Sequence, residues 1–402
     1  MDHLLRDRRA WGLMMAAMLT IMSNSTITPS LPGLEARFAD NPQAAVLTRM
    51  LITAPSLLVA LTAPFAGGLT DRLGRRKPLL IGMIVYAVAG TAGLYLTSLE
   101  ALLVSRLALG LGVAMIMTSQ AALVGDYFEG AARGRLLGYQ MAATNFGGLI
   151  FVTVAGLLAA SDARLPFAIY GLAALVLPLL AAILPEPPRF CAPTAGPGHA
   201  PRIDASEPGW QLTVAIMAIA SGLTFVIYYV VPTQIPFHLD EQGIGGPRAA
   251  SYVIGAMMFT AGLMSVITGW IRPWLGRIGT PVSGFLALAA GFALLALAHS
   301  LILAMLATAL MGVGMGLTMP TFITTALNVA PARHRGLVTG LVTSAIFLGQ
   351  FLSPLASQPL VTHLGYAGAF RMGTFAFVAL AIVLAATLRR RRPAMDKPLR
   401  VK

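Results

Sequence analysis

Three ionisable residues stand out because each lies inside or beside a long apolar stretch. Arg106 lies within the stretch at 99–128, Asp126 lies near its end, and Asp71 belongs to a short loop rich in glycine and arginine. An ionised side chain at membrane depth is costly unless it faces a polar interior, a water-filled cavity or a partner of opposite charge. Such residues bind ions or carry protons. We therefore expect a functional role for Arg106 and treat Asp126 and Asp71 as candidates for proton coupling.

The loop around Asp71 reads Gly-Gly-Leu-Thr-Asp-Arg-Leu-Gly-Arg-Arg-Lys. Its first glycines allow helices to approach closely, and a later glycine permits a tight turn. Its carboxylate can contact a helix N-terminus or an arginine. Contacts of this kind predict a conformational latch, whereas the simpler alternative is that the charges only orient and anchor the helices. The loop residues assigned to the latch are Gly67, Asp71, Arg72, Gly74 and Arg75.

Polar side chains inside other apolar stretches predict a substrate cavity. Gln120 falls within about 40° of Arg106 on one helical face, so we expect the two to line the same cavity. In the first and seventh stretches, polar residues precede prolines, and corresponding proline-interrupted helices are typical of substrate sites. Ordinary hydrogen bonding between helices is the alternative. The predicted cavity residues are Asn24, Arg106, Gln120, Asn145, Tyr228, Gln234 and Gln350.

The elements that must position these residues are membrane-spanning helices. Hydrophobic residues make up 57% of the chain, charged residues make up 11%, and the mean hydropathy is +0.77. A bilayer core takes about 20 apolar residues per helix, and continuous apolar runs predict helices rather than a barrel. The sequence therefore predicts an all-α integral membrane protein of twelve transmembrane helices. The predicted spans are 10–32, 45–68, 77–97, 99–128, 134–160, 164–185, 209–236, 249–271, 280–299, 301–330, 334–361 and 366–389.

The net charge of +13 is distributed unevenly over the loops. If the N-terminus is cytoplasmic, the opposite side keeps few basic residues, namely Arg37, Arg49, Arg164, Arg248 and Arg371. This asymmetry predicts that both termini face the cytoplasm. The arginine run at 389–392 is explained by this topology and by anionic lipid, so nucleic acid is not expected as a partner. Short loops favour a bacterial inner membrane, and a monomer in the lipid bilayer is the default.

An internal repeat divides the chain into two similar halves. Gly67, Gly74 and Arg75 recur 202 positions later as Gly269, Gly276 and Arg277. Further matches at the same offset extend over four helices, and they include Gly110, Gly112, Arg133, Gly134, Gly138 and Gly147. A parallel repeat of six spans is a known transporter architecture. It predicts an N-terminal six-helix bundle at 1–184, a cytoplasmic linker at 185–208 that is rich in proline, glycine and alanine, and a C-terminal bundle with a basic tail at 209–402.

At these motifs the chain resembles the major facilitator superfamily along nearly its whole length. The 67–77 loop matches the family's signature loop, and Arg106-Leu-Ala-Leu-Gly110-Leu-Gly112 resembles a second signature of its proton-coupled exporters. The resemblance implies that the loop pairs with Asp126, which completes the latch, and that Arg106, Asp126 or Asp71 couples protons. One departure is that span five lacks the Gly-Pro pair typical of the drug antiporters.

We therefore expect a secondary transporter that exports small organic molecules at the expense of the proton-motive force by alternating access. An uptake permease or facilitator is the alternative. Because no acidic residue lies near a span centre, while Arg106 does lie within a span, neutral or anionic substrates are favoured over cations. An enzyme is not expected, since no catalytic motif is present. No cofactor or metal is expected either, because Cys191 is the only cysteine and no phosphate-binding loop is found.

Overall fold

The computed structural model describes residues 3–63, 65, 74–187, 209–331 and 334–390, and this part of the chain is helical without strands. The first group of helices comprises α1 (Arg8–Ser25), α2 (Leu31–Arg37), α3 (Ala44–Thr62), α5 (Arg76–Thr91), α6 (Leu99–Tyr127), α7 (Gly130–Ala159) and α8 (Leu172–Ile183). The second group comprises α9 (Trp210–Tyr228), α10 (Val230–Glu241), α11 (Pro247–Leu295), α12 (Leu301–Val329) and α13 (Arg335–Arg390). Short 3-10 helices lie at His3–Arg6, Thr28–Ser30, Ala92–Leu94 and Leu165–Gly171.

The prediction of twelve transmembrane helices is confirmed. Eleven segments of the described chain are long and apolar enough to cross a membrane, and the last of them, Arg335–Ala386, contains 52 residues. This segment is too long for one crossing, since about 20 residues suffice. It bends at Gly365, whose φ of 68° favours glycine, and therefore supplies spans eleven and twelve. Gly276, with a φ of 71°, separates spans eight and nine in the same way.

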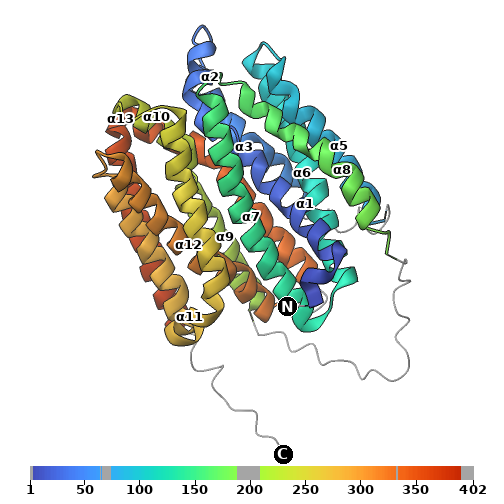
Figure 1. Ribbon diagram of the computed structural model, residues 1–402. Coiled ribbons are helices and arrows are strands. Elements are labelled where there is room, and N and C mark those ends of the chain that lie inside the picture. Colours follow the sequence, from blue (N-terminus) through green and yellow to red (C-terminus); the bar gives the residue numbers. More distant parts are fainter. Residues whose placement is uncertain (1–2, 64, 66–73, 188–208, 332–333, 391–402) are drawn as a thin grey trace, which may run out of the picture.

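The helices form two six-span bundles that lie side by side (Figure 1). The bundle made by the first group lies on the right of the view, and the second group lies on the left. We call the end of the molecule at which α1 begins the amino-terminal end. The other end, at which α2 and α10 lie, is the opposite end. The predicted linker at 185–208 falls mostly outside the described residues, so its boundaries remain a prediction.

Equivalent glycines make the same close contact in both bundles. A Cβ atom added to Gly110 would lie 2.3 Å from the carbonyl oxygen of Pro55, so α6 and α3 meet backbone to backbone. A Cβ atom added to Gly312 would lie 2.2 Å from the carbonyl oxygen of Met257. Both residues of this second contact lie 202 positions after those of the first. Small residues at such crossings allow the close packing on which helix association in lipid depends.

The first and seventh spans are interrupted at equivalent positions. The first changes from α1 to α2 through Thr26–Ser30, and the seventh changes from α9 to α10 at Tyr229. Prolines follow both breaks, as the sequence predicts, because proline removes a helical hydrogen bond and crowds the preceding turn. Tyr229 lies 202 positions after Ile27. The two breaks therefore lie at equivalent positions, one in each bundle.

Along α7, the contact with the second bundle is close near the opposite end and, within the described part of the chain, is missing at two glycines near the amino-terminal end. Near the opposite end, α7 packs against α11 so closely that a Cβ atom on Gly156 would lie 2.3 Å from the Ser251 hydroxyl oxygen. Near the amino-terminal end of α7, Gly134 and Gly138 have no atom within 4 Å of such a Cβ among the residues described. On the other flank, α3 and α13 also meet nearer the amino-terminal end, where the Ser344 hydroxyl donates to the Ala60 carbonyl at 2.6 Å.

Candidate functional site

A cavity of about 380 Å³ lies between the two bundles. Its wall combines residues of α1, α6 and α7 from the first bundle with residues of α9, α11, α12 and α13 from the second. The broken first and seventh spans both contribute, since Asn24, Tyr228 and Tyr229 lie in the wall. A site between the bundles is where relative movement of the two halves changes access.

The cavity wall is apolar and flexible. Phe225 and Phe347 add aromatic surface to it. Unbranched methionine side chains adapt to ligands of different shape, so a wall rich in them suits varied apolar molecules. None of the described lining residues is acidic, basic or a histidine. The methionines of the wall are Met117, Met141, Met257, Met258, Met315 and Met319.

A small polar cluster joins the bundles at one end of this cavity. The Asn24 side-chain amide donates to the Tyr229 hydroxyl and to the Gln350 Oε1, each at 3.2 Å. The Ser56 hydroxyl donates to the same Gln350 oxygen at 2.8 Å. Asn24 and Ser56 belong to the first bundle, and their partners belong to the second. The cluster therefore supplies hydrogen-bonding groups to a mostly apolar site, which is the usual way in which such a pocket orients a ligand.

The structure places four of the seven predicted cavity residues in the wall, namely Asn24, Asn145, Tyr228 and Gln350. Asn145 differs from Asn24 because its amide donates to the carbonyl of Met141 on its own helix, at 2.9 Å. Gln234 does not line the cavity. It lies nearer the opposite end and accepts a hydrogen bond from Arg49. In the sequence Gln234 follows the break in span seven closely, but the helix resumes at Val230 and carries it past the cavity.

The expectation that Arg106 and Gln120 share this cavity does not hold, because neither residue is in its wall. Arg106 is fully buried within the first bundle, where its guanidinium lies 4.5 Å from the Phe167 ring centre and 4.7 Å from that of Tyr170. One guanidinium nitrogen donates to the carbonyl of Gly90 at 3.2 Å. Cation–π contact and one carbonyl thus replace the carboxylate that a buried arginine usually pairs with.

The latch residues are described only in part. Gly67, Asp71 and Arg72 lie outside the described residues. The Arg75 Nε donates to the Asp126 carboxylate at 3.1 Å, and both side chains are partly exposed at the amino-terminal end. Both belong to the first bundle, so this ion pair does not join the halves. Gly74 has a φ of 87°, which favours glycine at the turn before α5.

Glu186 is a contact of this loop that no motif in the sequence predicts. Its carboxylate accepts hydrogen bonds from the backbone N–H groups of Arg75, at 2.6 Å, and Arg76, at 3.0 Å. It thus caps the N-terminus of α5, where a negative charge is favourable. In the sequence, the only indication of this role is that Glu186 is an acidic residue directly after an apolar stretch. It falls within the predicted linker, and the sequence predicts no role for it in the latch.

A second cavity lies beside the first, toward the amino-terminal end. It has a volume of about 400 Å³ and lies between α3 and α6 of the first bundle and α13 of the second. Met117 and Thr343 line both cavities, so the two are adjacent. Arg75 also lies in the wall of the second cavity. The second cavity therefore lies between the central cavity and the end that carries the Arg75–Asp126 pair.

The comparisons with known proteins agree with this geometry. A family model described as the Major Facilitator Superfamily matches residues 13–354 and, in a further match, residues 282–402. The chain belongs to this superfamily. It is accordingly a multi-pass membrane transporter, and the family resemblance stated from the motifs is confirmed.

Relatives in this superfamily include drug exporters. The chain is 26% identical over 387 residues to the multidrug efflux protein YfmO of Bacillus subtilis, and the match covers 94% of this chain and 93% of the relative. It is also 26% identical to multidrug resistance protein 1 of the same organism, covering 83% and 84%. Quinolone resistance protein NorA of Staphylococcus aureus is 20% identical, covering 77% and 80%.

Solved structures of other major facilitators share the fold. The crystal structure of a D-xylose–proton symporter superposes with a TM-score of 0.75 at 17% identity, covering 94% of this chain and 96% of that one. The human organic anion transporter MFSD10 superposes with a TM-score of 0.71 at 18% identity, covering 94% and 99%. At these identities the likeness extends to the fold and not to the substrate.

Proposed function

We propose that this transporter exports uncharged, mainly apolar organic molecules across a bacterial inner membrane, with the amino-terminal end facing the cytoplasm. The observation that carries the proposal is the central cavity, whose described wall contains methionine, aromatic and amide side chains but no charged group. An ionic ligand would lose its hydration there without gaining a counter-charge, which is costly. The multidrug exporters among the relatives support export rather than uptake.

The preference for neutral substrates narrows the expectation from the sequence, which allows neutral or anionic ones. That expectation rests on Arg106 inside the cavity, whereas the guanidinium is enclosed by Phe167 and Tyr170 in the first bundle. With the arginine outside the wall, the positive charge that would favour an anion is missing from the site. Neutral compounds with one or two hydrogen-bonding groups fit the cluster around Asn24 and Gln350.

Proton coupling is proposed to involve carboxylates outside the cavity. The described cavity wall offers no group that titrates near neutral pH. Asp126 is paired with Arg75, and Arg75 lies in the wall of the second cavity, so Asp126 is the leading proton carrier among the described residues. Asp71 is the other candidate and lies outside the described residues. The protein is proposed to act as a monomer.

Cells that express the protein are expected to accumulate less of a neutral fluorescent compound than cells with an empty vector. The reason is that export lowers the internal concentration while the proton gradient persists. A permanently cationic analogue of the same compound should accumulate equally in both strains, because the cavity holds no counter-charge. Flow cytometry measures both. Higher accumulation of the neutral compound on expression would instead indicate uptake and would contradict the export proposal.

A further inference from the structure

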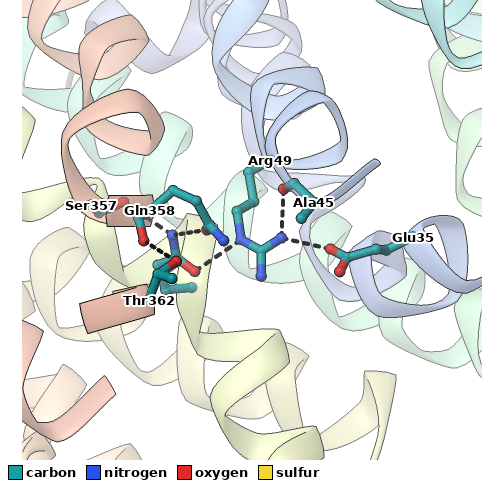
Figure 2. Close-up of polar contacts among 7 residues, drawn as sticks. Glu35, Ala45, Arg49, Ser357, Gln358 and Thr362 are labelled. Atoms are coloured by element: carbon teal, nitrogen blue, oxygen red, sulfur yellow. Dashed lines mark hydrogen bonds and ion pairs between the residues drawn. The ribbon is translucent and has the colours of Figure 1, made fainter. Parts of the chain in front are cut away.

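Arg49 joins the two bundles at the opposite end (Figure 2). Its Nη1 lies 2.6 Å from a carboxylate oxygen of Glu35 and also donates to the carbonyl of Ala45 at 2.6 Å. Its Nε donates across the interface to the Gln234 Oε1 at 3.0 Å. The guanidinium also lies 3.6 Å from the ring centre of Phe237 in the second bundle. We call this set of contacts the Arg49 strut.

The strut is anchored on both sides. Only 4% of the Arg49 side chain is exposed, and Glu35 is 30% exposed. In the second bundle, the Gln234 amide donates to the Ser357 hydroxyl at 3.0 Å and to the Gln358 side-chain oxygen at 3.3 Å. The ion pair itself lies within the first bundle. The charge of Arg49 therefore stays paired with Glu35 if the bundles separate. Separation breaks its contacts with the second bundle, which include the hydrogen bond to Gln234, the contact with Phe237 and an interaction with the Tyr366 hydroxyl.

Below the strut, two polar stripes face each other across the interface. On α3, positions 49, 53 and 56 share one helical face, and on α13 positions 350, 353 and 357 do. The helices pack together in opposite directions. Ser56 bonds to Gln350 at the cavity end, and Arg49 reaches Ser357 through Gln234 at the other end. We call the residues Arg49, Thr53, Ser56, Gln350, Ser353 and Ser357 the polar seam.

The middle of the polar seam is buried but incompletely hydrogen-bonded. Thr53 and Ser353 are both fully buried, and their hydroxyl oxygens have no hydrogen-bond partner within the described part of the chain. An apolar side chain would be less costly at a permanently closed helix interface, because an unpaired hydroxyl loses its hydration without compensation. These hydroxyls would regain partners if water entered between the bundles.

We propose that the polar seam is the wall of the passage through which the central cavity opens to the opposite end, and that the Arg49 strut is the gate of that passage. The seam begins at Gln350, which lines the cavity, and ends at Arg49. In the present structure the gate is closed, and the second cavity adjoins the central cavity on the side of the amino-terminal end. In the alternate state Arg49 stays paired with Glu35, and its hydrogen bond to Gln234 is broken. Water then enters between the two helices along the polar seam. This assignment uses the transporter function of the family and does not depend on which compound is carried.

Cysteine labelling tests the passage. Cys191 is first replaced by serine, and Thr53→Cys or Leu51→Cys is then introduced into the purified, membrane-reconstituted protein. Leu51 is equally buried on the other face of α3, so it is the matched control. A water-soluble maleimide is expected to label Thr53→Cys at least about tenfold faster than Leu51→Cys, because only the former is hydrated when the passage opens. Ser353→Cys is expected to be labelled at a rate similar to that of Thr53→Cys. Equal, slow labelling at Thr53 and Leu51 would overturn the passage.

Two substitutions at Gln234 test the gate in opposite directions. Gln234→Leu removes one hydrogen-bond partner that Arg49 has in the second bundle. It is expected to speed labelling of Thr53→Cys about tenfold, which corresponds to the loss of one hydrogen bond to a charged group. Gln234→Glu offers a carboxylate to Arg49 and is expected to slow the same reaction. Loss of native structure would expose the buried cysteine and speed its labelling. Slower labelling in Gln234→Glu therefore reports on the gate and not on misfolding. Labelling rates that do not change with either substitution would overturn the gate.

Discussion

Replacing Asn24 by leucine is expected to lower the transport rate about tenfold or more, because the substitution removes two hydrogen bonds that join the bundles beside the cavity. The Tyr229 hydroxyl and the Gln350 Oε1 both accept from the Asn24 amide, each at 3.2 Å. Leucine leaves these polar groups facing an apolar side chain. It also removes one of the few groups in the wall that can hydrogen-bond to a neutral substrate. Initial rates in proteoliposomes measure the effect.

Asn145→Leu is the matched control for this prediction. Asn145 lies in the same wall, but within the described part of the chain its amide bonds only to the Met141 carbonyl one turn earlier on α7. That carbonyl also belongs to the helix's own hydrogen-bond ladder, so little is lost. We expect Asn145→Leu to retain transport within about threefold, the range of ordinary surface-like changes. Equal loss in both variants would mean that the cluster around Asn24 has no special role.

Arg106→Ala is expected to destabilise the protein strongly while leaving its substrate preference unchanged. The substitution removes a fully buried side chain from between Phe167 and Tyr170 and leaves a void in the first bundle. Large-to-small changes of this kind cost about 2–5 kcal/mol. The midpoint of thermal unfolding in detergent should fall by several degrees. Relative binding of matched neutral and anionic compounds should stay as in the wild type, since Arg106 does not line the cavity.

Arg37→Ala provides the comparison, because Arg37 is an exposed residue at the end of α2. Its removal should leave the unfolding midpoint within experimental error. The opposite pattern in Arg106→Ala, with an unchanged midpoint and a specific loss of anion binding, would place Arg106 in the substrate site after all.

The fold could be predicted from the sequence because its signals are long and repeated. Twelve apolar stretches, the offset of 202 residues and the prolines of spans one and seven each constrain a whole helix rather than one contact. The breaks in spans one and seven also predict that Asn24 and Tyr228 line the cavity, and the structure places both in its wall. A polar residue beside a break in a helix near the middle of the bundle has few other places to go.

The role of single charged residues could not be predicted in the same way. Helical periodicity places Arg106 and Gln120 on one face of α6, but it does not say which neighbouring helix that face meets. The aromatic rings that receive Arg106 come from residues 167 and 170, more than sixty positions away. In the sequence, Arg49 is only one of several outer basic residues. Its proposed role depends on the hydrogen bond to Gln234, which lies 185 positions away. No local sequence pattern indicates such a pair.

The most direct test of proton-driven export is transport in proteoliposomes of one neutral compound and its permanently charged cationic and anionic analogues, with and without a pH gradient. Wild-type protein is expected to move the neutral compound faster when the gradient is applied and to move neither ion. Asp126→Asn should lose the response to the gradient while keeping its unfolding midpoint, because the partly exposed pair with Arg75 contributes at most about 1 kcal/mol to stability. Transport of the neutral compound at the same rate with and without the gradient would contradict coupled export and would make this protein a facilitator.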